Sequence, residues 1–448
     1  MQLLDLPDEL LDICCSRIDE LTEPFDEEAH PTADQINLEA LRSLRLTCRR
    51  ISPLASKQLF SRLSLLPTKS SAVKARSILE ESRLSPLVKT ICLSASLNDR
   101  RSREDGPLPS WTIRDENEPE WEVGANNEEH AFDMDGELSA TFKEMMADIG
   151  QFRHLRRIEL NFHREVEGPS ADEDNRQAYD LTETVEYRDM FLRKLLSALN
   201  HAEHPASRLN SLSIYNLQDW FNAGIGRSRN FKAVLARLEE LELFVKSEQD
   251  GASETEIEIP ERHDFYSGQL REYWLQPLQD IGRLTRLKLY GSIPWGYLPK
   301  CDLRGLHFPK LKSLDLGNMT FTHEWQLEWI LSHGSSLEEL TLLTCPIITK
   351  IELVWRVDAE GYSILPPRHR GTGRGRNVLA ESKYGSRWHD YFDSFREKLP
   401  HLRHFVTTHD EWLQCHGGPG SAARAFQAPR SRPAQAELSI HSYREFSG

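Results

Sequence analysis

One short pattern of apolar residues returns along most of this 448-residue chain and constrains its fold more than any other feature. The pattern is Leu-x-x-Leu-x-Leu, with Ile or Val in some places. Its last two apolar residues alternate with polar ones, which predicts a short strand with one apolar face, because successive side chains of a strand point to opposite sides. The copies are Val88–Leu93, Leu155–Leu160, Leu209–Ile214, Leu238–Leu243, Leu284–Leu289, Leu311–Leu316 and Leu337–Leu342, with a degraded copy at Leu402–Phe405.

A single strand of this kind cannot bury its apolar face, whereas stacked copies can, and leucine-rich repeats are the natural arrangement. The copies that start at 284, 311 and 337 are 27 and 26 residues apart, inside the window of about 20–29 residues for such repeats. We therefore predict an irregular leucine-rich-repeat solenoid over residues 67–415 and an α/β fold class. The alternatives are strands of an ordinary α/β sheet and chance recurrence. Helices are expected near 70–82, 139–149, 185–198, 231–236, 273–279, 325–332 and 388–399.

The first sixty residues have a helical pattern instead. Leu6-Pro7-Asp8-Glu9 has the form of a helix start, since proline costs nothing where amide donors are unpaired and acidic residues suit the positive helix end. Pro53 marks a break between a second and a third helix. The predicted apolar stripes are Leu10, Leu11, Cys14 and Ile18 in the first helix, Leu41, Leu44, Cys48 and Ile51 in the second, and Leu54, Leu59, Phe60 and Leu63 in the third.

The order of these residues resembles an F-box: Leu6-Pro7 at the opening, Cys48-Arg49-Arg50 in the second helix and Leu59-Phe60 at the close. The acidic spacer at 19–37 departs from the usual motif, which joins the first two helices within a few residues. An ordinary helical bundle is the alternative. Residues 331–348 and 387–405 also resemble the C-terminal half of F-box proteins from filamentous fungi.

The resemblance implies a three-helix F-box domain over residues 1–66. It also implies the function of a substrate-recognition subunit of a Skp–cullin–F-box ubiquitin ligase, which is not itself an enzyme and reaches the cullin through a Skp-type adaptor protein. A repeat scaffold for protein interactions with no ubiquitin role is the alternative. By position, the adaptor contacts would be Leu6, Pro7, Leu10, Leu11, Ile13, Leu44, Cys48, Ile51, Leu54 and Leu59.

The repeat strands also predict a target-binding surface. Polar positions between the leucines, among them Glu242, Arg286 and Lys288, should lie on the concave face, and the residue after each unit continues that face. This places Tyr215, Phe244 and Tyr290 at one register, and exposed aromatic residues among polar groups are typical of protein-binding hot spots. The alternative is that another part of the chain packs over these rings.

Composition excludes several function classes. The formal net charge of −15 argues against general nucleic-acid binding. No uncharged apolar run approaches the roughly 18 residues of a membrane span, and the acidic start differs from a secretory signal, so we expect a cytoplasmic or nuclear protein. The seven cysteines are scattered and typical of buried thiols in a reducing compartment.

No catalytic motif, metal site or cofactor site is predicted, because the nucleotide-binding, hydrolase and metalloprotease motifs are absent. His401, His404 and His409 are interpreted as a histidine-rich surface loop. Polar loop inserts are expected at 98–136, 165–175 and 357–377, and a disordered tail at 416–448. The basic, glycine-rich run within 357–377 is interpreted as a flexible loop rather than as an RNA contact.

Overall fold

The computed structural model describes residues 6–16, 33–95, 138–163, 183–247, 260–353, 357–362 and 380–408. These residues form two compact units, the first from 6–163 and 190–210 and the second from 183–189 and 211–408. The predicted inserts at 98–136 and 165–175 and the predicted tail lie outside the described residues. Most of the spacer at 19–37 does too, although its last residues belong to the second helix.

The N-terminal helices are α1 (Asp8–Ser16), α2 (Ala33–Thr47) and α3 (Ser52–Leu59). Helix α1 begins where the sequence predicts, with the backbone amides of Leu10 and Leu11 each donating to the Pro7 carbonyl over 3.1 Å. The prediction that Leu63 belongs to the third helix is wrong. Leu63 lies in strand β1 (Arg62–Leu65), where it is buried and pairs with the next strand.

The strands of the first unit are β1, β2 (Thr90–Ser94) and β3 (Arg157–Asn161), which run parallel in that order. Their helices are α4 (Lys69–Glu80), α5 (Ala140–Ala147) and α6 (Val185–Leu199), and the division between the two units falls inside α6. The rings of Phe142 and Phe162 each pack on Phe191 of α6, with centroids 6.2 Å and 6.4 Å apart. The predicted strand–helix alternation is confirmed here.

Six strands of the second unit lie side by side in sequence order, and each pair among these six is parallel. The repeated leucines lie side by side, Leu241 next to Leu287, Leu314 and then Leu340, and all four are fully buried. The strands are β4 (Ser211–Gln218), β5 (Glu240–Lys246), β6 (Arg286–Trp295), β7 (Ser313–Met319), β8 (Glu339–Leu343) and β11 (His404–Thr408).

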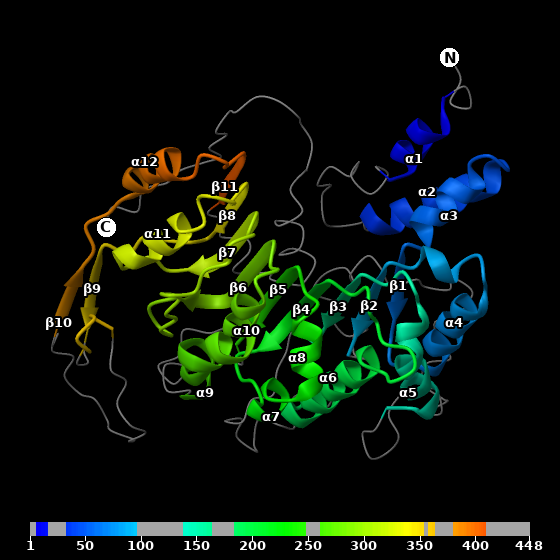
Figure 1. The fold of residues 1–448 in the computed structure, drawn as a ribbon, viewed down its shortest axis with the longest axis horizontal. Helices are drawn as coiled ribbons and strands as arrows, with labels where there is room; N and C mark the ends of the chain where they lie inside the picture. The colour runs from blue at the N-terminus through cyan, green and yellow to red at the C-terminus, as the bar shows by residue number, and fades with distance from the viewer. Residues whose placement is uncertain are drawn as a thin grey trace, which may run out of the picture. The chain divides into compact units, whose positions relative to one another are not determined.

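Helices connect these strands and, with the right-handed crossovers that parallel strands require, α8, α10 and α11 lie along one side of the sheet (Figure 1). The opposite face is therefore formed by the polar side chains of the strands themselves. The helices of the second unit are α7 (Ala223–Gly226), α8 (Arg229–Leu235), α9 (Pro260–Asp264), a π-helix (Phe265–Leu275), α10 (Gln276–Ile281), α11 (Glu324–Leu331) and α12 (Trp388–Lys398).

Two backbone features were not predicted. Strands β9 (Lys350–Leu353) and β10 (Ala380–Lys383) form a separate antiparallel pair. Asn216, Asn318 and Thr344 have left-handed backbone angles, with φ of 57°, 59° and 50°. Each of the three is the seventh residue after the first leucine of its copy, so the same left-handed backbone conformation recurs in three copies, within or directly after the strand. This recurrence supports a repeated structural unit independently of the leucine spacing.

None of the helices within the described ranges has both the length and the apolar composition needed to cross a lipid bilayer. Taken together, the described elements form an α/β protein with an N-terminal helical group and parallel strands in both units.

Candidate functional site

The N-terminal helices enclose a small apolar core of their own. Cys15, Leu41, Ile51 and Ala55 are buried at its centre, and Leu44, Cys48, Leu54 and Leu59 pack on them. On α1 the buried residues are Leu11 and Cys15, four positions apart. The predicted stripe through Leu10 and Cys14 is therefore wrong in register, because both of these residues are exposed.

Ion pairs fix α1 against α3 and the turn that precedes it. Arg50 donates from Nε to Asp8 Oδ1 over 2.8 Å and from Nη2 to the Leu6 carbonyl over 2.6 Å. Lys57 Nζ lies 2.5 Å from Asp12 Oδ2. Exposed pairs of this kind contribute about 0–1 kcal/mol each. They act together with the burial of Leu11 and Cys15, which turns Leu10 and Ile13 outward.

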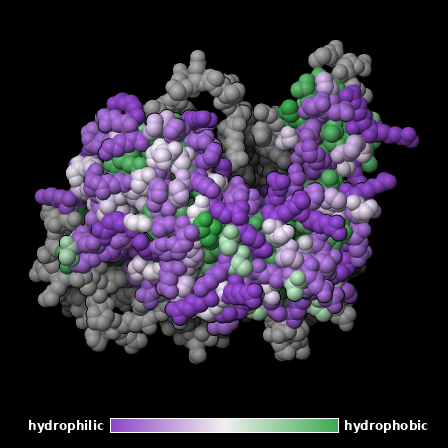
Figure 2. All heavy atoms as spheres, viewed as in Figure 1, coloured by the Kyte–Doolittle hydropathy of each residue, from purple (hydrophilic) through white to green (hydrophobic). Residues whose placement is uncertain are grey.

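Large apolar side chains of the N-terminal helices are exposed. Leu10 is 45% exposed, Ile13 is 48% exposed and Leu46 on α2 is 85% exposed. The only other large apolar residue of comparable exposure among the described residues is Val73 on α4, at 49%. Figure 2 shows the apolar surface gathered over the N-terminal helices. We call Leu10, Ile13 and Leu46 the N-terminal apolar surface. α2 and the residues just beyond it also carry exposed arginines, namely Arg42, Arg45 and Arg49.

The predicted adaptor contacts divide into two groups. Pro7, Leu10 and Ile13 are exposed, and Leu6, Leu44, Cys48, Leu54 and Leu59 are partly exposed. Leu11 and Ile51 are buried in the core of the helical group, where they pack the helices together. Leu46 was missed because it falls off the apolar stripe of α2. A leucine flanked by arginines on the polar side of an amphipathic helix was the signal that could have identified it.

The strands of the second unit carry a polar row on the face opposite the helices, as the alternation predicts. Ser213 Oγ donates to Glu242 Oε2 over 2.9 Å. Lys288 Nζ lies 3.5 Å from Glu242 Oε1 and 3.4 Å from Asp315 Oδ2, so one ammonium bridges two carboxylates on the neighbouring strands. All three charged residues are buried, at 5–6% exposure. Burial raises the pKa of the Asp315 carboxyl, and the Lys288 charge opposes that rise.

Three aromatic rings follow this row at the next register. The rings of Tyr215 and Phe244 stack with centroids 4.6 Å apart, and Phe244 and Tyr290 are 5.8 Å apart. Tyr215 and Tyr290 are partly exposed, as predicted for a binding surface. The prediction that Phe244 is exposed is wrong, because its neighbours cover it on both sides and leave 5% of it accessible. Of the other predicted target contacts, Arg286 pairs with Glu339 over 3.4 Å, and Glu242 and Lys288 are buried in the polar row.

The Tyr290 ring also lies directly against Gly317 on the next strand, where an added Cβ would overlap the ring. We expect Gly317→Ala to displace Tyr290 and to destabilise the second unit, as overpacking usually does, by about 1–3 kcal/mol. Denaturant unfolding of Gly317→Ala, Tyr290→Ala and the double variant measures the coupling. The two changes should be strongly non-additive, since Tyr290→Ala removes the overlap. Additive effects would show that the ring is not what excludes a side chain at 317.

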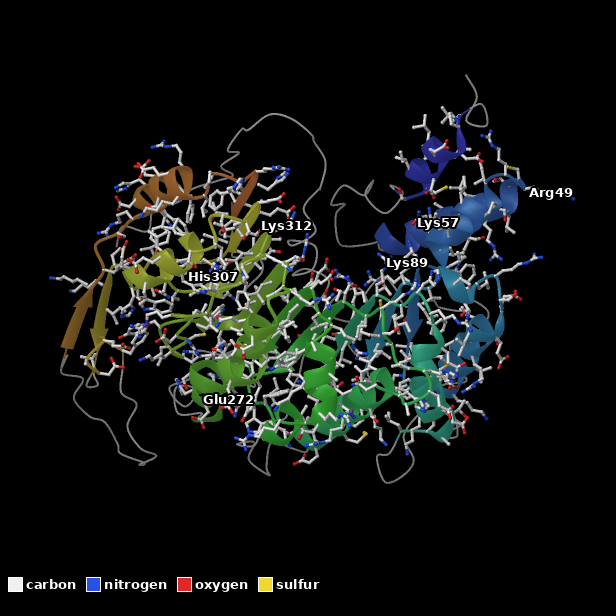
Figure 3. The ribbon with its side chains drawn as sticks, in the orientation of Figure 1. Arg49, Lys57, Lys89, Glu272, His307 and Lys312 are labelled. Atoms are coloured by element: carbon white, nitrogen blue, oxygen red, sulfur yellow. The ribbon has the colours of Figure 1, made fainter. Side chains whose placement is uncertain are left out.

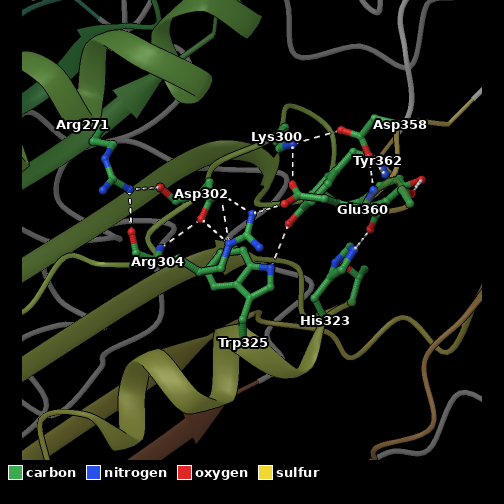
Figure 4. A network of polar contacts seen from close by, with 12 residues as sticks. Arg271, Lys300, Asp302, Arg304, His323, Trp325, Asp358, Glu360 and Tyr362 are labelled. Carbon is green, nitrogen blue, oxygen red and sulfur yellow. Dashed lines mark hydrogen bonds and ion pairs between the residues drawn. The ribbon is translucent and has the colours of Figure 1, made fainter.

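A separate polar cluster joins the loop after β6 to the turn at residues 357–362 (Figure 4). Lys300 Nζ pairs with Asp358 and Glu360 over 3.0 Å and 3.1 Å and lies 4.2 Å from the centre of the Tyr362 ring. Arg304 pairs with Asp302 over 2.6 Å and with Glu360 over 2.7 Å. These ion pairs tie the loop after β6 to the turn at 357–362.

The described residues contain no group of three His, Cys, Asp or Glu side chains that could bind a metal ion. His401 and His404 are exposed near the start of β11, and His409 lies outside the described residues. The thiols of Cys15, Cys92, Cys301 and Cys345 are buried as predicted, whereas Cys14 is exposed. Burial raises the pKa of the Cys301 and Cys345 thiols to about 12, which leaves them protonated and unreactive.

No protein-family model matches the chain, and no curated protein matches it. The fold defines the class directly: an α/β protein with an N-terminal helical group and parallel strands ordered as in the sequence. Within that class, the N-terminal apolar surface and the strand face of the second unit are the two features that bear on function.

Proposed function

We propose that the chain is the substrate-recognition subunit of a Skp–cullin–F-box ubiquitin ligase and that its N-terminal apolar surface binds a Skp-type adaptor. The observation that supports this proposal best is the exposure of Leu10, Ile13 and Leu46. Burying a Leu or Ile side chain is worth about 1.5–3 kcal/mol. A partner that covers these three exposed side chains would therefore gain free energy from their burial.

The second unit would then bind the target protein. Its strands present Tyr215, Tyr290 and Arg286 at positions that retain solvent exposure, and aromatic and arginine side chains are the residues that most often dominate binding energy. In this arrangement the chain positions a target and other subunits carry out ubiquitin transfer. No cofactor or metal is required of the chain itself.

A protein-interaction scaffold with no ubiquitin role is the second candidate. In that case α1–α3 would only cap the apolar end of the repeat strands, and their apolar residues would be turned toward the strands. The outward direction of Leu10, Ile13 and Leu46 favours a receptor over a cap.

The test is a calorimetric titration of the full-length chain with a purified Skp-type adaptor. Leu10→Asp/Ile13→Asp should weaken binding at least about 100-fold, because burying the exposed half of each side chain contributes about 1 kcal/mol and two charges are introduced at the interface. Both positions are exposed, so thermal unfolding of the variant should be unchanged.

The matched control is Val73→Asp, which introduces the same charge at an equally exposed apolar position on α4. It should bind the adaptor as the wild type does. Unchanged binding by the double variant, or equal loss in Val73→Asp, would rule out the N-terminal apolar surface as the docking site.

A further inference from the structure

Among the described residues, the last strand of the second unit has a partner on one side only. Strand β11 pairs with β8 from His404 opposite Glu339 to Thr408 opposite Leu343, and no described residue pairs with its other edge. The His404 amide donates to the Glu338 carbonyl over 3.1 Å. Because alternate residues of a parallel strand bond to the same neighbour, the backbone groups of Phe405 and Thr407 point to the open edge. An open edge of this kind accepts an added strand.

Basic side chains gather at the end of the sheet where β11 begins, on the residues that precede β7 and β11. Lys312 is 62% exposed and Arg403 is 76% exposed, and Lys310, His401 and His404 are exposed beside them. Figure 3 labels Lys312 at this end of the strands. One carboxylate, Glu338, lies between Lys312 at 2.9 Å and Arg403 at 3.6 Å, and these charges lower its pKa.

Glu339 at the start of β8 is paired with Arg286, so three permanent positive charges face Glu338 alone and make a basic corner, which is unusual on a chain of net charge −15. We call Lys310, Lys312 and Arg403, with the neighbouring histidines, the basic corner.

We propose that the open edge of β11 binds an acidic, extended segment of a partner protein as an additional strand. The main-chain groups of Phe405 and Thr407 would supply the strand hydrogen bonds, and Lys312 and Arg403 would attract the carboxylates of the partner. The identification of that partner with the ubiquitination target rests on the proposed function, whereas the binding site itself does not.

A second copy of this chain is a poorer occupant of the edge. Two copies related by a twofold axis would pair their β11 edges antiparallel, so each basic corner would lie beside Thr407 and Thr408 of the other copy, which offer no carboxylate. An acidic segment meets both requirements of the edge, because its backbone satisfies the open N–H and carbonyl groups and its side chains neutralise the excess positive charge.

The probe is a fluorescein-labelled octapeptide of alternating Glu and Val, titrated with the full-length chain and followed by fluorescence anisotropy. Binding should weaken at least about tenfold as NaCl rises from about 0.05 M to about 0.5 M, since exposed charges are screened by salt. The matched peptide of alternating Lys and Val should not bind. A Glu–Val peptide that is N-methylated at alternate residues should also fail to bind, because it cannot form the strand hydrogen bonds.

Two protein variants locate the site. Thr407→Pro removes an edge N–H that β8 does not use and should abolish binding, whereas Thr407→Val, which keeps the N–H, should bind as the wild type does. Lys312→Gln/Arg403→Gln should weaken binding about tenfold or more. Arg229→Gln/Lys232→Gln, which removes two exposed charges on α8, is its matched control and should have no effect.

Equal binding of the normal and N-methylated peptides, or of Thr407→Pro and Thr407→Val, would overturn the proposal, as would binding of the lysine peptide. The N-methylated peptide tests the wild-type chain, so the result does not depend on the folding of Thr407→Pro. Sedimentation of a dimer that is lost in Thr407→Pro would assign the edge to a second copy instead. The adaptor is absent from every titration, so a failure here is separate from a failure of adaptor docking.

Discussion

Replacing Lys288 by methionine is expected to lower the free energy of unfolding by about 3–5 kcal/mol, because it leaves two buried carboxylates without their shared cation. Lys288 lies between Glu242 and Asp315 on adjacent strands, and all three are nearly inaccessible to water. Methionine nearly matches lysine in length and is apolar, so the loss reports on charge rather than on a cavity. Denaturant unfolding at neutral pH measures it.

The loss should shrink as the pH is lowered. The pKa of Asp315 is already raised by burial, and removing Lys288 removes a charge that lowers it. A carboxyl with a raised pKa binds its proton more tightly in the folded state than in the unfolded state, so protonation on acidification favours folding. Adding Glu242→Gln and Asp315→Asn to Lys288→Met should likewise recover much of the lost stability.

The control for Lys288 is Lys312→Met, which breaks a pair with Glu338 that lies at the surface. Its effect should stay within about 1 kcal/mol. Equal destabilisation by the two substitutions would show that the loss in Lys288→Met does not come from the burial of its ion pairs.

Acidification from pH 6.5 to pH 4 should cost the wild-type chain about 3 kcal/mol through His333 alone. This side chain is fully buried beside α11; its Nδ1 donates to the Trp329 carbonyl over 3.0 Å, and its Nε2 accepts from the Phe308 amide over 3.2 Å. Burial, with a smaller contribution from His307, lowers the pKa of His333 to about 4.

The free energy of unfolding falls with pH because the proton binds more tightly to the unfolded chain. Between pH 6.5 and pH 4 the histidine is protonated in the unfolded chain and neutral in the folded one, so the unfolded state binds more protons and stability falls as the pH falls. Denaturant unfolding at several pH values measures the slope. His333→Gln, which keeps a donor and an acceptor but does not titrate, should remove this part of the slope.

His307 provides the matched control. It stacks on His333 with centroids 5.0 Å apart but is exposed. His307→Gln should leave most of the slope in place. A slope that is the same in the wild type and in His333→Gln would contradict the assignment to His333.

The strands were predictable because their signal is local. Each copy of Leu-x-x-Leu-x-Leu predicts which side chains are buried. The structure places the equivalent leucines of neighbouring copies in register, namely Leu241, Leu287, Leu314 and Leu340. Strand β1 was missed because Leu63 follows a helix without a break in its apolar spacing, and only pairing with β2 makes it a strand. The π-helix at 265–275 and the β9–β10 pair also depend on contacts far along the chain.

The candidate surfaces were predictable only in part. The apolar spacing identified α1 and α2, but the choice between Leu10 and Leu11 as the buried residue depends on how α1 packs on α3, where Arg50 and Lys57 pair with Asp8 and Asp12. The sequence also identified the aromatic register of Tyr215, Phe244 and Tyr290. How closely the three rings pack could not be predicted from the sequence, and this packing buries Phe244.

The unbroken register between β7 and β8 has a consequence for how such a chain could lengthen. Leu314 and Leu340 pair with no shift, and residues 311–336 span one strand and one helix, from one leucine to its equivalent in the next copy. Each strand pairs only with its neighbours, and no ring must close. A tandem duplication of this segment would therefore insert one more strand at the same spacing, and an in-frame deletion would remove one. The width of the strand face therefore depends on the number of repeats encoded in the gene, which a single duplication or deletion can change.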